Sequence, residues 1–136
     1  MTPFERILRD LLTEGHGARF RAAGDSMYPA IRDGELVDIV PCDASSLRRG
    51  DIVLAAMRRG LTLHRIVRIS PDGIITRGDN ATCDDGIITS ANLLGREMNR
   101  SSGNNKWRST AKSVKIIRFA AELLRRLRSV QLRFQR

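Results

Sequence analysis

The chain has 136 residues, of which 41% are hydrophobic and 29% charged, so it is long enough and apolar enough for one folded domain with a modest core. It contains no run of about 18 consecutive apolar residues, and its first ten residues mix acids with arginines. The sequence therefore predicts neither a membrane-spanning helix nor a secretory signal peptide, and we expect a cytoplasmic protein.

The net charge of +9 is concentrated at the carboxyl-terminal end. Residues 1–105 carry 14 basic and 14 acidic side chains, whereas residues 106–136 carry 10 basic side chains and one acid, Glu122. All the lysines lie in this tail. Such an asymmetry indicates a neutral body with a basic appendage that meets an anionic partner.

The cysteine and histidine content argues against a metal site. Cys42 and Cys83 form no CxxC pair and no zinc-ligand spacing, and the chain has only two histidines. We expect both thiols to be reduced in the cytoplasm, and we expect neither a metal nor another cofactor.

The first half of the chain predicts one helix followed by strands. Pro3 and apolar residues at helical spacing indicate a helix over 3–14 that ends at Gly15. Strands are expected at 19–23 and 35–41, on either side of a turn-rich segment. Further along, the pattern predicts strands at 51–57, 61–69, 74–77 and 93–98, a hairpin turn at Arg59-Gly60 and a polar loop at 78–86.

The tail predicts a linker at 101–105 and a basic amphipathic helix at 113–134. Such a helix either lies on an anionic membrane surface, at the inner membrane face, or packs on the body or on a second copy. No nucleic-acid-reading motif accompanies it, so we expect no specific nucleic-acid binding. The predicted organisation is a helix at 1–18, a mainly β, antiparallel domain at 19–100 and a linker with a basic helix at 101–136.

Ser26 is the first candidate for chemistry. It lies among turn-forming residues, and Gly24 before it would let the backbone approach a ligand closely. A serine nucleophile needs this exposure and a base to take its proton. The structural alternative is that Ser26 caps a short helical turn.

His64 is the preferred base because the body contains no lysine and because His16 lies between two glycines with no chemical group around it. Alternation over 61–69 places His64 on the opposite strand face from Leu63, and a strand holds an imidazole rigidly. The alternative is a half-exposed structural histidine. In the loop 78–86, Asp79 or Asp85 could orient the ring if that loop folds against the strand, or these aspartates only bond their own backbone.

Taken in order, four segments resemble the successive signatures of type I signal peptidases and their LexA-repressor relatives. They are Gly24-Asp25-Ser26-Met27-Tyr28-Pro29, Gly50-Asp51-Ile52-Val53, His64-Arg65-Ile66-Val67, and Gly78-Asp79-Asn80 with Asp84-Asp85. The likeness covers about residues 20–97.

This resemblance implies coiled antiparallel β-sheets and a serine acyl-enzyme mechanism. Ser26 matches the nucleophile, and His64 falls where the endoplasmic-reticulum and spore-former branches carry a histidine base. The acidic partner would be Asp85 first and Asp79 second. The family adds its peptide substrate as a strand and prefers small residues beside the cut, and Met27, Tyr28 and Ile31 are expected to line the groove.

The chain departs from the family at two points. Many signal peptidases have a hydroxyl residue where Gly24 stands, so the oxyanion must rely on backbone N–H groups, that of Ser26 among them. The amino-terminal segment predicts a helix without membrane character. The predicted function is a serine endopeptidase acting on a peptide or protein precursor; the alternatives are a catalytically silent peptide-binding module and a self-cleaving LexA-like regulator.

Overall fold

The computed structural model describes residues 1–100, with side chains as far as Met98. The linker and the basic helix expected at 101–136 lie outside the described residues, so their predicted contacts with a membrane, the body or a second copy stay predictions.

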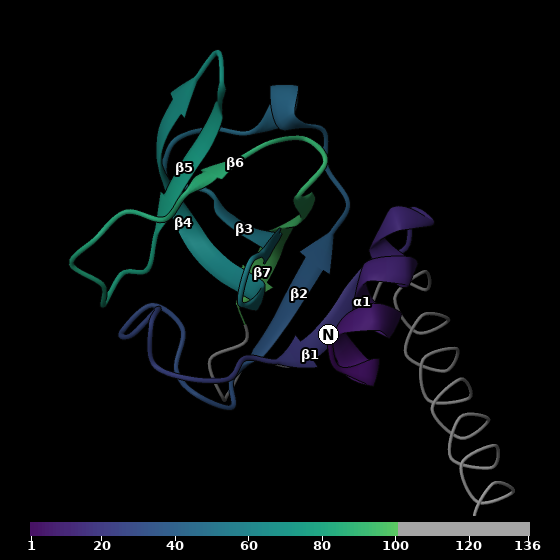
Figure 1. Cartoon of the computed structure of the whole chain (residues 1–136). Coiled ribbons are helices and arrows are strands. Elements are labelled where there is room, and N and C mark those ends of the chain that lie inside the picture. Colours follow the sequence, from purple (N-terminus) through teal and green to yellow (C-terminus); the bar gives the residue numbers. More distant parts are fainter. Residues whose placement is uncertain (101–136) are drawn as a thin grey trace, which may run out of the picture. The chain divides into compact units, whose positions relative to one another are not determined.

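The chain begins with helix α1 (Pro3–Thr13), close to the predicted range. Its start is fixed by a capping box, in which the Thr2 side chain accepts from the Glu5 N–H and the Glu5 carboxylate accepts from the Thr2 N–H. One face of α1 buries Leu8, Leu11 and Leu12, and Figure 1 shows the helix beside β1. Among the described residues no helix has the length and apolar character needed to cross a bilayer.

The rest of the described chain forms one antiparallel sheet in the order β1-β2-β7-β3-β4-β5-β6 (Figure 1), which confirms the predicted mainly β class. The elements are β1 (Ala18–Arg21), β2 (Leu36–Val40), the short 3-10 helix η1 (Ala44–Ser46), β3 (Ile52–Met57), β4 (Gly60–Ser70), β5 (Gly73–Arg77), β6 (Ile87–Ile88) and β7 (Leu93–Arg100).

Two local details differ from the sequence prediction. The turn between β3 and β4 consists of Arg58 and Arg59, and Gly60 is already the first residue of β4, paired with Met57. Strand β6 was not predicted, because two residues are too short to show a strand's alternation.

Both faces of the central strands are buried. On β3, Leu54 packs in a cluster with Leu8 and Leu12 of α1, whereas its neighbour Val53 packs in a second cluster with Ile66 of β4. Because consecutive strand residues point to opposite faces, these two clusters lie on the two sides of β3. A register shift between Ile66 and Arg68 bends β4 at its middle, just beyond His64.

Two strand edges stay unpaired within residues 1–100. Strand β4 pairs with β3 from Gly60 to Arg65, but its pairing with β5 begins only at Arg65. The edge of β4 from Leu61 to His64 therefore has no strand beside it in this part of the chain. Strand β1 ends the sheet and pairs only with β2.

Candidate active site

Ser26 lies in the turn that follows β1, and its side chain is exposed. The residues around it anchor the turn: the Tyr28 N–H donates to the Asp25 carbonyl at 3.0 Å, and Met27 and Ile31 are buried in the core. No backbone N–H of the following turn donates to the Ser26 hydroxyl in the described structure, so Ser26 is not a helix cap there.

His64 points its ring from β4 toward Ser26. Its Nε2 lies 3.0 Å from Ser26 Oγ, and its Nδ1 lies 2.7 Å from Asp85 Oδ2. Since a carboxylate only accepts hydrogen bonds, Asp85 selects the tautomer with its proton on Nδ1. Nε2 then keeps a lone pair directed at the serine hydroxyl.

Asp85 is itself held by β5. The Thr76 hydroxyl donates to Asp85 Oδ2 at 2.7 Å, and the Asp85 N–H donates to the Thr76 carbonyl at 2.8 Å. Thr76 is buried. The carboxylate oxygen that faces the imidazole therefore accepts from two donors, which fixes its position behind the ring.

Asp79 does not reach His64. It forms a two-point contact with Arg65, with N–O distances of 2.8 and 2.7 Å, and the Arg65 guanidinium also donates to the Gly50 carbonyl at 2.9 Å. The Asp79 hydrogen bond raises the pKa of Arg65. The structure thus separates the two aspartates that the sequence left as alternatives.

The start of the loop 78–86 packs directly on the turn that carries Ser26. The Asn80 N–H donates to the Ser26 carbonyl at 2.8 Å, and its side-chain amide donates to the Asp25 carbonyl at 3.3 Å. A Cβ at Gly78 would lie 2.6 Å from the Ser26 carbonyl oxygen and 3.1 Å from His64 Nε2. Only glycine leaves room for the two chain segments to approach this closely.

A cleft of about 420 Å³ opens beside Ser26 and His64. Its rims are the end of β1 with the residues after it, the first part of β4, and the first turn of α1. Met27 and Ile31 line the cleft, but Tyr28 does not: its ring is half exposed and lies 5.9 Å from the Arg32 guanidinium carbon. A substrate contact for Tyr28 stays a prediction.

The backbone N–H of Ser26 is available to a ligand. Within residues 1–100 it donates to no protein acceptor, whereas the Gly24 N–H donates to Asp33 at 2.8 Å. This donor can meet the oxygen of a carbonyl group bound at Ser26. The described side chains include no group of three metal-binding residues.

Sequence reasoning did not assign roles to Thr76 and Arg65. Thr76 gave one faint signal, a hydroxyl side chain in an otherwise apolar strand that follows Ile74 and Ile75. Arg65 stands next to His64, but its role as the anchor of Asp79 depends on the path of a loop that no periodicity describes.

Comparison with known protein families found one match, to a family model described as Peptidase S24-like, over residues 4–97. No significant match was found among curated proteins or among solved structures. The matched segment contains Ser26, His64 and Asp85, and it supports the signal-peptidase and LexA superfamily that the sequence indicated. Assignment to the histidine-base branch stays a prediction. Because the match covers 94 of 136 residues (4 to 97), the chain belongs to the Peptidase S24-like family.

Proposed function

We propose that this chain is a serine endopeptidase in which Ser26 is the nucleophile, His64 the general base and Asp85 the partner of the base. The observation that carries the proposal is the continuous hydrogen-bonded line from Ser26 Oγ through the imidazole to Asp85, with distances of 3.0 and 2.7 Å. Its distances and order are those of a serine peptidase site.

The acylation step follows from this line. His64 Nε2 removes the Ser26 proton as Oγ attacks the carbonyl carbon of the scissile peptide bond. The carbonyl oxygen becomes negatively charged, and the unpaired Ser26 N–H donates to it. His64 then gives its proton to the leaving amine as the C–N bond breaks, which leaves an acyl ester on Ser26.

Deacylation repeats the proton transfers with water. His64 takes a proton from water, the oxygen attacks the ester, and the proton returns to Ser26 Oγ as the C–O bond breaks. Asp85 accepts from Nδ1 throughout and stabilises the imidazolium that forms in each half.

The two unpaired strand edges indicate how a peptide would bind. Ile66 exchanges backbone hydrogen bonds with Gly50 and Asp51, on the side of β3. Antiparallel hydrogen bonding alternates along a strand, so Leu63 and Leu61 direct their backbone groups to the other side, into the cleft. An extended peptide between β4 and the end of β1 would add a strand to the sheet and bring its carbonyl to Ser26.

The direct test is covalent labelling with a fluorophosphonate probe, read by intact mass. We expect one label per wild-type chain and none on Ser26→Ala, and a large loss of labelling rate for His64→Ala. The matched controls are Ser45→Ala and His16→Ala, which remove an exposed serine and an exposed histidine away from the site.

Labelling that persists in Ser26→Ala, or a wild-type chain that never reacts, would contradict the peptidase proposal. A wild-type chain that resists the probe yet binds extended peptides would favour the catalytically silent module.

A further inference from the structure

The first turn of α1 closes one end of the cleft by touching both of its rims. The Phe4 ring meets the Phe20 ring of β1 edge-on, with centroids 5.9 Å apart. On the other rim, the Leu61 N–H of β4 donates to Glu5 Oε1 at 3.4 Å. The helix therefore spans the gap between the two unpaired strand edges.

Glu5 accepts a hydrogen bond from a backbone N–H of β4 that a peptide bound as an added strand would otherwise use. The Leu61 N–H points away from β3, as the alternation along β4 requires, and it is one of the groups that an extended peptide in the cleft would use. Gly60 makes the close approach possible, because a Cβ there would lie 2.6 Å from Glu5 Oε1.

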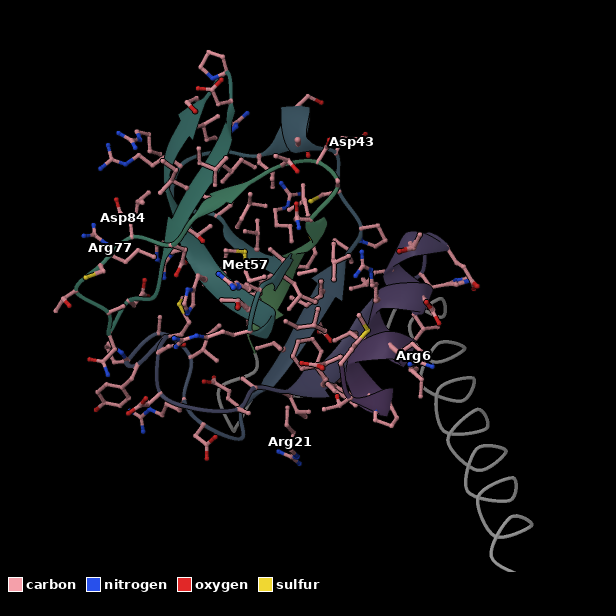
Figure 2. The ribbon with its side chains drawn as sticks, viewed as in Figure 1. Arg6, Arg21, Asp43, Met57, Arg77 and Asp84 are labelled. Atoms are coloured by element: carbon pink, nitrogen blue, oxygen red, sulfur yellow. The ribbon has the colours of Figure 1, made fainter. Side chains whose placement is uncertain are left out.

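The start of α1 holds the Glu5 carboxylate in this position. Its second oxygen accepts from the Thr2 N–H at 2.6 Å as part of the capping box. These backbone hydrogen bonds, from Thr2 first and from Leu61, lower the pKa of Glu5, so the acceptor is ionised at neutral pH. Arg21 also lines the cleft, but its guanidinium donates to the Gly34 carbonyl, and Figure 2 shows the side chain directed away from the sheet.

We propose that Glu5 is a specificity-determining residue that ends the peptide-binding edge at Leu61 and so limits how much substrate is held on this side of the cut. Each residue away from the scissile bond advances one residue along β4, whichever way the peptide runs. Three substrate residues can then lie opposite His64, Leu63 and Thr62. The fourth would lie opposite Leu61, where the Glu5 carboxylate already accepts the backbone N–H. A role in substrate specificity requires the proposed peptidase function, whereas the peptide binding that tests it can be measured without catalysis.

The experiment measures peptide binding in the Ser26→Ala chain by fluorescence anisotropy. The probes are fluorescein-labelled peptides of alanine and valine that carry one to five residues on the amino side or on the carboxyl side of a central Ala-Ala bond. With Glu5 present, we expect the affinity in one of the two series to rise as the peptide grows from one to three residues on that side of the Ala-Ala bond. The fourth and fifth residues should add nothing. In Glu5→Ala, the fourth residue should add about fivefold in affinity, the usual effect of one backbone hydrogen bond.

Two control variants separate this role from helix capping and from charge. Glu5→Gln keeps an oxygen that can accept from Leu61 and should keep the level response. Thr2→Ala weakens the same cap without freeing the Leu61 N–H, so affinity should again stay level beyond the third residue. Circular dichroism then reports the helix content of each variant. The inference is overturned if Glu5→Ala and Glu5→Gln respond alike to peptide length, or if affinity with Glu5 present keeps rising at the fourth residue. Failure of Ser26 to react with a fluorophosphonate would contradict the peptidase proposal alone.

Discussion

The loop between β5 and β6 has an aspartate at each end, and the two aspartates bind different side chains of β4. Asp85, at the end near β6, accepts from His64 at 2.7 Å and has Thr76 as a second donor. Asp79, at the end near β5, is bound in a two-point contact by Arg65. The same side chain thus supports the imidazole at one end of the loop and fastens the loop to β4 at the other.

The difference follows from the alternation of β4. His64 and Arg65 are consecutive, so their side chains leave the strand on opposite faces. The loop contacts both, and between these contacts Asn80 holds the carbonyl of Ser26. One loop therefore holds His64 and the turn that carries Ser26 in place relative to each other, and the effects of the two aspartates can be compared by mutation.

Asp85→Asn should slow the reaction more than any other change to this loop. An amide can donate to His64 Nδ1 and so favours the tautomer with its proton on Nε2, which cannot accept from Ser26. We expect the rate of peptide hydrolysis, or of fluorophosphonate labelling, to fall on the order of 10⁴-fold with little change in stability.

Asp84→Asn is the matched control, because it removes the neighbouring carboxylate, which lies 3.4 Å from Arg77 instead of His64. A comparable loss of rate in Asp84→Asn, or a fall of less than about tenfold in Asp85→Asn, would mean that Asp85 is not the partner of His64 in the reaction.

A smaller effect is expected for the ion pair of Arg65 and Asp79. The two side chains are partly shielded from solvent, with 29% of the Arg65 and 20% of the Asp79 side-chain surface exposed, and they meet in a two-point contact. Asp79→Ala and Arg65→Ala should therefore each lower the free energy of unfolding by about 1–3 kcal/mol. The labelling rate should fall about tenfold, because the turn that carries Ser26 is held less firmly while His64 keeps its contact with Asp85. Urea unfolding and labelling kinetics measure the two effects.

The pair of Arg77 and Asp84 provides the contrast within the same loop. Figure 2 shows the two residues next to each other, and both are roughly half exposed, with N–O 3.4 Å. A double-mutant cycle there should give a coupling of about 0–1 kcal/mol. Equal coupling energies for the two pairs would remove the special role that we give to Arg65 and Asp79.

Much of this site could be predicted because it depends on local pattern. Alternation over 61–69 fixed the face of His64, and the turn formers around Ser26 indicated an exposed serine. The choice between Asp79 and Asp85 could not be made from pattern, because it depends on where an irregular loop crosses the end of a strand. The position of the Tyr28 ring could not be predicted either, because it depends on an irregular turn that buries Met27 and Ile31 and leaves the ring half exposed.

The smallest effect on the labelling rate is expected for Thr76. Its hydroxyl is the second donor to the Asp85 oxygen that faces His64, whereas Asp79 accepts from the Arg65 guanidinium. Thr76→Val preserves shape and removes this donor, so we expect a fall of about fivefold in labelling rate, as for one hydrogen bond. Thr76→Ser keeps the hydroxyl and should restore most of the rate. If serine and valine behave alike, the threonine only fills space in the core, and the position of Asp85 is then fixed by its own backbone N–H, which donates to the Thr76 carbonyl in every variant.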